Sequence, residues 1–336
     1  MPWKGEKDPY KIWLSEIILQ QTRVEQGWNY YNKFIEAFPT IRHLARAPEK
    51  KIFKMWEGLG YYTRCKNLIA TARKISDEYK GVFPSTYNEI KQLKGIGPYT
   101  AAAISSFAFN EPQAVVDGNV QRVISRYFGI TTPIDTAEGK KQYQQLAQQL
   151  LHVRQPGIYN QAIMDFGAVI CKPQNPLCKE CIQKNECKAV KENLVKQLPV
   201  KAKSLVKKER WLYYFVLQVD DKVYLRKRTG RDIWENLHEF ILMETKGPQE
   251  DEPAKLLWLK KLMGRQNFRV MNTSRVFSQQ LTHQVIHGQF ITVSTNKPVT
   301  GLKDYRLTPR SQLKKHAFPR LINTFLNEKT TQAALF

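Results

Sequence analysis

The chain contains no long apolar run and no recognisable export signal. No apolar stretch reaches the roughly 18 residues that a membrane-spanning helix requires. The N-terminal Met-Pro-Trp-Lys-Gly-Glu has no apolar core of the kind found in signal peptides. Internal repeats and long low-complexity tracts are absent as well. These absences predict a soluble, cytoplasmic protein with no membrane partner.

Acidic residues are scarce relative to basic ones. The sequence has 30 aspartates and glutamates against 53 lysines and arginines, which gives a formal net charge of +23. Such a surplus repels basic partners and attracts polyanions. By charge alone the candidates are DNA, RNA and anionic membranes, and the lack of an apolar segment disfavours the membrane.

The length of 336 residues is too great for one ordinary helical core and predicts two domains. From Tyr10 to about Lys188 the apolar residues recur at helical spacing, so residues 1–189 are predicted to be all-α. Residues 190–210 are rich in lysine and are interpreted as a linker, with a solvated helix face as the alternative for their first half. Strand-like patterns are found at residues 211–219, 222–228, 239–243, 276–280 and 283–294, and a helix is expected at 253–263. Residues 211–336 are therefore predicted to be α+β.

Cysteine is rare, yet four of the five cysteines lie within seventeen residues. A disulfide scaffold is disfavoured because the chain lacks an export signal. Buried, unligated thiols are disfavoured because this loop is polar and contains proline. The uneven spacing C-x6-C-x2-C-x5-C suits a 4Fe-4S cluster better than zinc, which more often uses two C-x2-C pairs. The predicted ligands are Cys171, Cys178, Cys181 and Cys187.

Two further segments, a glycine-containing turn and a carboxylate at a predicted helix start, carry candidate functional residues. Gly95 and Gly97 lie in Leu93-Lys94-Gly95-Ile96-Gly97-Pro98, where a tight turn before a helix would present backbone N–H groups to a phosphate. An ordinary helix–helix turn is the alternative. Asp117 follows twenty residues after Gly97 and is predicted to open a helix, whose dipole favours a negative charge there; a simple N-cap is the plainer interpretation.

Glu16 lies among apolar neighbours in Trp13-Leu14-Ser15-Glu16-Ile17-Ile18-Leu19-Gln20-Gln21-Thr22. Burial there would raise its pKa and keep a proton available for a leaving group. Taken alone, the pattern favours a solvent-facing glutamate on an amphipathic helix. The segment matches, however, the pattern W-L-S-E-x-x-L-Q-Q-T, which is similar to the signature of adenine DNA glycosylases.

Together with the cysteine spacing and the glycine turn, this segment resembles the MutY family of the endonuclease III superfamily. The resemblance implies a helix-hairpin-helix glycosylase domain with a structural 4Fe-4S cluster, acting in base excision repair. It implies that Glu16 protonates adenine and that Asp117 stabilises or traps the sugar cation, with Tyr99 and Asn119 supporting Asp117. Bifunctional relatives carry a lysine where this chain has Tyr99, so a monofunctional enzyme is expected.

The family must also extrude the adenine from double-stranded DNA and recognise its partner base, 8-oxoguanine or guanine. Leu19, Gln21 and the segment 58–62 resemble the elements that wedge into the duplex, with Tyr61 beside the oxidised guanine. A core role for the adjacent tyrosines is the alternative.

Residues 211–336 resemble the Nudix-like C-terminal domain of the same family. No R-E-x-x-E-E pattern for magnesium occurs in the sequence, so the domain is expected to recognise a lesion without hydrolysing it. The family's aromatic-serine-histidine motif corresponds to Leu281-Thr282-His283. The leucine departs from the pattern, while Thr282 and His283 keep a hydroxyl and an imidazole; a structural histidine is the alternative.

At the C-terminus, residues Gln332-Ala333-Ala334-Leu335-Phe336 resemble a peptide that docks on the replication sliding clamp, and a frayed tail is the alternative. A monomer associated with the bacterial nucleoid is expected. Relatives carry an additional N-terminal helix before the equivalent of Met1, so a shortened or miscalled start is a further expectation. Two other functions stay open: an endonuclease III-like lyase acting on oxidised pyrimidines, and a redox-sensing DNA-binding protein without catalysis.

Overall fold

The computed structural model describes residues 5–20, 22, 24–202, 207–249 and 252–328. The chain divides into two compact units. The first comprises Met1–Arg46 and Lys66–Ser204, and the second comprises Ala47–Cys65 and Leu205–Phe336. None of the described helices is long and apolar enough to cross a membrane.

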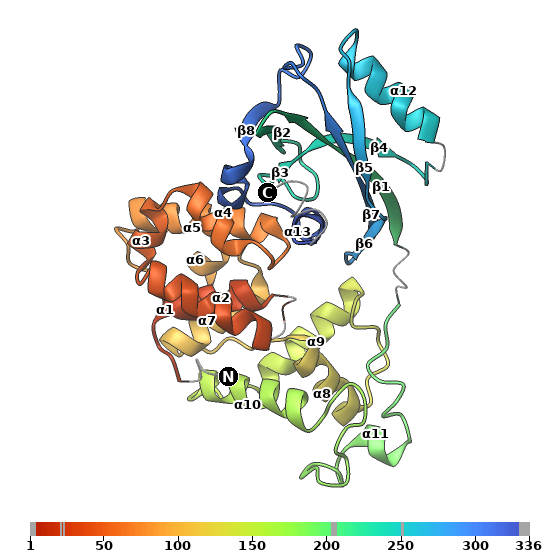
Figure 1. Cartoon of the computed structure of the whole chain (residues 1–336). Coiled ribbons are helices and arrows are strands. Elements are labelled where there is room, and N and C mark those ends of the chain that lie inside the picture. The colour runs from red at the N-terminus through yellow and green to blue at the C-terminus, as the bar shows by residue number, and fades with distance from the viewer. Residues whose placement is uncertain (1–4, 21, 23, 203–206, 250–251, 329–336) are drawn as a thin grey trace. The chain divides into compact units, whose positions relative to one another are not determined.

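The first unit is built from helices, as expected, and several begin at sequence-encoded caps (Figure 1). Asp8, Thr86, Asp117 and Thr136 each accept a backbone N–H of the helix that follows, which satisfies a donor that the first turn would otherwise leave unpaired. The helices are α1 (Pro9–Leu19), α2 (Val24–Ala37), α3 (Ile41–Arg46), α5 (Tyr62–Asp77), α6 (Tyr87–Lys91), α7 (Pro98–Phe109), α8 (Gly118–Phe128), α9 (Ala137–Leu150), α10 (Pro156–Val169) and α11 (Lys188–Lys191).

Small residues let the central helices of this unit approach one another closely. Helix α7 carries three buried alanines at 101–103 and packs against α1, α6 and α10. A Cβ atom added to Gly167 of α10 would come within 2.8 Å of the Asn119 Cβ atom on α8, so only glycine allows this contact. These contacts place the ends of α1, α7 and α8 near each other, and those ends carry the candidate catalytic residues.

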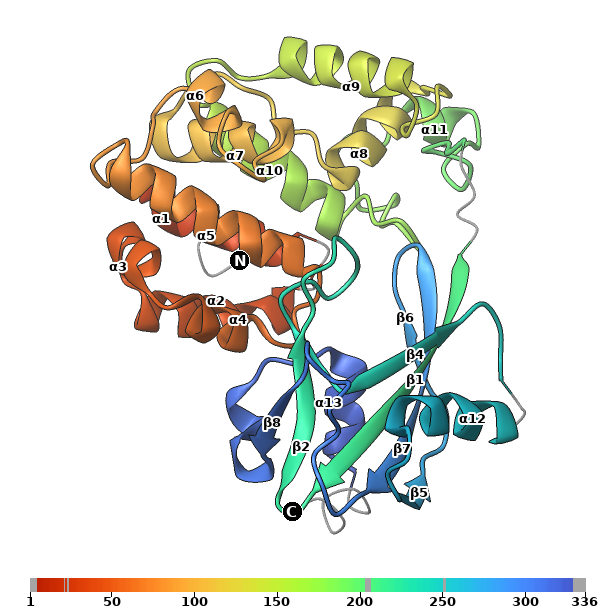
Figure 2. The same ribbon diagram turned by 90° about the horizontal axis from the view of Figure 1, so that it is seen from above.

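The second unit contains a mixed sheet with helices on its two faces (Figure 2). By the division into units, α4 (Glu49–Trp56) also belongs to it. Strand β1 pairs in parallel with β7, and the other pairings are antiparallel. The strand order is β3-β2-β1-β7-β5, with β4 on β1, β6 on β7 and β8 on β2. The strands are β1 (Lys208–Val219), β2 (Lys222–Lys227), β3 (His238–Glu239), β4 (Ile241–Thr245), β5 (Arg269–Thr273), β6 (Phe277–Gln280), β7 (Gln284–Ser294) and β8 (Arg306–Pro309).

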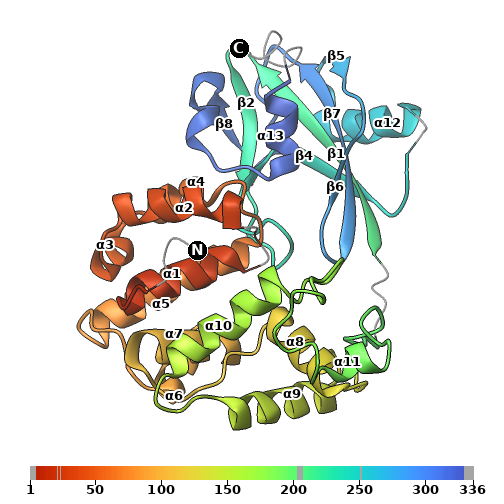
Figure 3. The same cartoon turned by 90° about the horizontal axis from the view of Figure 1, so that it is seen from below.

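Helices α12 (Glu252–Met263) and α13 (Arg320–Leu326) lie on opposite faces of this sheet (Figure 3), and aromatic contacts attach each of them. On one face, Trp258 of α12 stacks on Phe215 of β1 with ring centroids 5.1 Å apart. On the other face, Phe325 of α13 stacks on Phe290 of β7 at 4.0 Å. A short 3-10 helix, η1 (Arg310–Lys315), precedes α13. The predicted fold class, an all-α domain followed by an α+β Nudix-like domain, is confirmed.

Candidate active site

Glu16 occupies the inner side of α1 and lines a pocket. Its neighbours Trp13 and Ile17 are buried, and the pocket is shared with Ser15, Gln161 and Asp165. Burial of the Glu16 carboxyl, the largest influence, raises its pKa from the model-compound range to about 7, because a buried carboxylate loses hydration. A hydrogen bond from Tyr99 acts in the opposite direction, and the nearby Asp117 carboxylate raises the pKa further. The carboxyl therefore keeps a substantial protonated fraction near neutral pH.

Tyr99 stands in the first turn of α7, close to both carboxyl groups. Its hydroxyl donates to Glu16, and both Glu16 and Asp117 act on it electrostatically. Burial, followed by these two negative charges, raises the phenol pKa. The hydroxyl consequently stays protonated and remains a donor over the whole physiological pH range.

Asp117 is the N-cap of α8, and its carboxylate is held from two sides. The Val120 backbone N–H donates to Asp117 Oδ1 and the Asn119 side chain donates to Oδ2, both at 2.7 Å. The structure thus brings Glu16, Tyr99, Asp117 and Asn119 together from α1, α7 and α8. Asp117 does not line the pocket that Glu16 lines. It occupies the neighbouring position, where the helix dipole of α8 favours an anion.

A hydrogen-bonded chain leads from Asp117 to the cysteine loop. The Asn119 amide oxygen accepts from Arg122 Nη2 at 2.9 Å. The same guanidinium donates to the Gly167 carbonyl and, through Nε, to the Cys171 carbonyl, each at 2.7 Å. Arg122 was not among the site residues predicted from the sequence. Its position one helical turn after Asn119 was the available signal, because residues three apart share a helix face.

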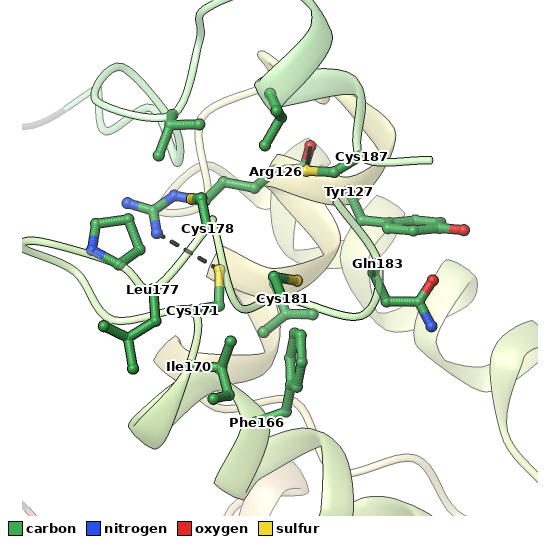
Figure 4. Close-up of a pocket in the computed structure, with 14 residues that line it drawn as sticks. Arg126, Tyr127, Phe166, Ile170, Cys171, Leu177, Cys178, Cys181, Gln183 and Cys187 are labelled. Atoms are coloured by element: carbon green, nitrogen blue, oxygen red, sulfur yellow. Dashed lines mark hydrogen bonds between the residues drawn. The ribbon is translucent and has the colours of Figure 1, made fainter. Parts of the chain in front are cut away.

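The four predicted cysteine ligands line one pocket (Figure 4). The remainder of its lining is largely apolar, with Phe166, Ile170 and Leu177 beneath the thiols. Arg126 Nη1 lies 3.5 Å from the Cys171 sulfur, and the Cys187 thiol donates to the Arg126 carbonyl at 3.4 Å. In the part of the chain that the structure describes, no three His, Cys, Asp or Glu side chains are already arranged as metal ligands. A largely apolar pocket with four thiols and an adjacent guanidinium nevertheless fits an anionic iron–sulfur cluster.

The glycine turn before α7 has the geometry expected of a phosphate-binding hairpin. Gly95 adopts a left-handed φ of +79°, and a Cβ atom there would come within 2.6 Å of the Asn67 side chain. Gly97 is the N-cap of α7 and leaves the first amides of that helix without a side-chain cap. The Thr71 hydroxyl donates to the Lys94 carbonyl at 2.8 Å and steadies the turn.

Other predicted DNA-contacting residues are distributed over both units. In the first unit Leu19 packs on Gly27 of α2, and Gln21 lies outside the described residues. In the second unit the Tyr61 and Thr282 hydroxyls are hydrogen-bonded to each other. Tyr61 adopts a left-handed φ of +46° and is 46% exposed. His283 is exposed, at the turn between β6 and β7.

Comparisons with known proteins agree with this arrangement. Residues 14–152 match the HhH-GPD superfamily of base excision DNA repair proteins, and residues 213–328 match the NUDIX domain. A fold with this helical hairpin and paired carboxyl groups defines a DNA glycosylase of that superfamily.

An adenine DNA glycosylase from Buchnera aphidicola is 35% identical over 300 residues, which cover 88% of this chain and 82% of the relative. The chain belongs to the adenine DNA glycosylase family.

Two solved structures resemble the helical unit. A thermostable thymine-DNA glycosylase aligns with a TM-score of 0.53 and 32% identity, covering 57% of this chain and 88% of that one. A non-covalent endonuclease III–DNA complex aligns with a TM-score of 0.50 and 21% identity, covering 56% of this chain and 87% of that one. The second likeness establishes the fold alone.

Proposed function

We propose that this protein excises adenine mispaired with 8-oxoguanine or guanine in double-stranded DNA, as a monofunctional glycosylase. The observation that carries the proposal is that Glu16, a carboxyl of raised pKa hydrogen-bonded to Tyr99, lies within electrostatic range of Asp117, a second, capped carboxylate. Two carboxyl groups whose environments differ in this way can serve as acid and as electrostatic stabiliser in one reaction. The family assignment supplies adenine as the base.

In the proposed reaction the protonated Glu16 donates its proton to the adenine ring. The C1′–N9 bond breaks, and its electron pair leaves with the protonated base. Asp117 faces the resulting sugar cation and either stabilises it or forms a transient ester with it. Water adds at C1′, its proton is released, and an abasic site remains. Tyr99 orients the Glu16 carboxyl by donating to it.

Monofunctional chemistry follows from the side chains that are present. Schiff-base formation with the sugar requires an amine at the reacting carbon. Tyr99 offers a phenol at that place, and Lys7, a lysine that lines the Glu16 pocket, donates its ammonium to the Phe107 carbonyl at 2.9 Å. Strand cleavage by an endonuclease III-like lyase is therefore disfavoured.

Recognition of the partner base is assigned to the second unit. The hydrogen bond between the Tyr61 and Thr282 hydroxyls supports the proposal that both residues belong to one recognition surface. The exposed His283 follows Thr282 in the chain. A donor and acceptor pair of this kind suits the oxidised face of 8-oxoguanine.

The proposal includes a monomeric protein at the bacterial nucleoid. The clamp-binding segment, residues 332–336, lies outside the described residues.

The cysteine pocket is proposed to hold a 4Fe-4S cluster on Cys171, Cys178, Cys181 and Cys187. When bound, the cluster would cross-link the loop around the four cysteines. Arg126 would balance part of its negative charge, and Arg122 would connect the Cys171 backbone to Asn119 and Asp117. The loop thereby helps to hold the carboxylate in position.

Replacing a cysteine tests this assignment. Cys178→Ser is expected to lower the iron and acid-labile sulfide content from about four of each per chain to well below one, because thiolates hold such clusters. Iron and sulfide analysis of the purified protein measures the change. The matched control is Cys65→Ala, which removes a buried thiol outside the pocket and should leave the iron content unchanged. Full iron content in the Cys178 variant contradicts the assignment.

The proposed function is tested by incubating the purified protein with duplexes that contain adenine opposite 8-oxoguanine, guanine or thymine. Alkali-labile sites are expected for the first two duplexes and not for the third. Strand breaks without alkali treatment would instead indicate a lyase. Binding to DNA without any base release would indicate a non-catalytic protein.

A further inference from the structure

Arg210 of β1 has a guanidinium group with every N–H donor occupied. Nε donates to Glu244 at 2.7 Å and Nη2 donates to the same carboxylate at 2.9 Å. Nη1 and Nη2 donate to the two oxygens of Asp232 at 2.8 and 2.7 Å. The fifth N–H, on Nη1, points to the Gln284 side-chain oxygen at 3.3 Å. Because a guanidinium has five donors, none is left for a phosphate.

The contacts of Arg210 belong to a larger network of equal and opposite charges. Arg228 bonds to Asp232 at 3.0 Å and to Glu239 at 2.5 Å, and Arg226 bonds to Glu239 at 2.8 Å. Glu239 is 1% exposed, and the Arg210 side chain is 11% exposed. Three arginines and three carboxylates make the network neutral. It therefore adds nothing to the attraction that this basic protein exerts on DNA.

The network meets the β6–β7 turn at its base. Gln284 is the first residue of β7 and directly follows Leu281-Thr282-His283. The backbone secures this turn at two more points, because Leu281 N donates to the Gln284 carbonyl at 2.8 Å and Lys208 N donates to the His283 carbonyl at 3.0 Å. Arg210 adds a side-chain hydrogen bond to Gln284. Through its ion pair with Asp232, it also connects Gln284 to the segment between β2 and β3.

We infer that Arg210 is a positioning residue for recognition of 8-oxoguanine: through Gln284 it fixes the turn that carries Thr282 and His283. This inference rests on the proposed function, since it concerns the preference for 8-oxoguanine over guanine opposite adenine. Three hydrogen bonds hold the turn, which keeps the Thr282 hydroxyl and the His283 imidazole in the positions that hydrogen bonding to a base requires. Loosening one point lowers that preference without altering the excision chemistry.

Two variants break the contact between Arg210 and Gln284, and the first of them breaks that contact alone. Gln284→Ala removes the acceptor and leaves the ion pairs intact, whereas Arg210→Lys keeps the charge and loses the planar fork. Each is expected to lower the ratio of single-turnover rate constants for 8-oxoguanine:adenine and guanine:adenine duplexes by about tenfold. The guanine:adenine rate constant itself should stay unchanged. Arg210→Lys also gives up paired hydrogen bonds to Asp232 and Glu244, so the comparison that decides is the double variant, which should show no loss beyond that of Arg210→Lys alone. Arg275→Lys, which alters an exposed ion pair with Glu328 in the same unit, serves as the matched control.

The outcomes separate this inference from the proposed function. If the wild-type protein shows no preference for 8-oxoguanine, the assignment of lesion recognition fails, and the role of Arg210 fails with it. If the wild type shows the preference and both variants keep it, only the role of Arg210 is overturned. Additive losses, or an equal loss with both duplexes, also overturn it, since the network would then stabilise the unit in general. Thermal melting of each variant verifies that the unit is folded.

Discussion

Asp117→Asn is expected to lower the single-turnover rate constant for adenine release by about a thousandfold, which corresponds to about 4 kcal/mol. The substitution removes the negative charge that faces the sugar cation. Asparagine is as good an N-cap as aspartate, so α8 should still begin at this residue and the fold should persist. Quenched-flow or manual single-turnover assays with an 8-oxoguanine:adenine duplex measure the effect.

The control for this variant is Asp8→Asn, at the N-cap of α1. Asp8 Oδ1 accepts the Tyr10 backbone N–H at 2.9 Å, so the same change of charge occurs at an equivalent helix position. Its rate constant should remain within about twofold of the wild type, since surface cap charges contribute only modest energies. DNA affinity of the Asp117 variant should also persist. Wild-type base release by Asp117→Asn is incompatible with the enzyme proposed here.

Glu16→Gln is expected to lower the same rate constant by about a thousandfold, within the range of general acid catalysis. Glutamine fills the same space but has no proton to donate to the leaving base. The wild-type rate constant should fall about tenfold per pH unit above the Glu16 pKa of about 7, because only the protonated carboxyl is competent. The variant should lose this dependence on pH. A pH profile of single-turnover rates for both proteins provides the measurement.

Glu36→Gln on α2 is the appropriate control for Glu16→Gln. Glu36 is exposed, and its substitution should change neither the rate constant nor the pH profile. A wild-type profile that stays flat from pH 6 to 9 would separate base release from the protonation of Glu16. The acid would then have to be sought elsewhere in the pocket.

Local patterns in the sequence determined much of the architecture. The helical spacing of apolar residues up to Lys188 and the strand alternation from Trp211 both have structural counterparts. The sequence also predicted the N-cap at Asp117 and the tight turn at Gly95, because caps and turns depend on a few adjacent residues. Strand β5 was not predicted. Four of its five residues are exposed, so it has no alternating pattern to detect.

Only the tertiary structure decided what the candidate residues can do. The sequence left open whether Glu16 faces solvent. Burial of its carboxyl, together with the nearby Asp117 carboxylate, raises its pKa, and this depends on how α1 packs in the folded unit. The hydrogen bonds from Arg122 to the Cys171 carbonyl and from Arg210 to the Gln284 side chain likewise form only in the folded protein. The sequence also did not predict that segment 47–65 belongs to the second unit, since this segment lies within the residues that match the glycosylase superfamily. Periodicity reports which side of a helix or strand is apolar, whereas pKa values and hydrogen-bond partners depend on groups far apart in the chain that meet only after folding.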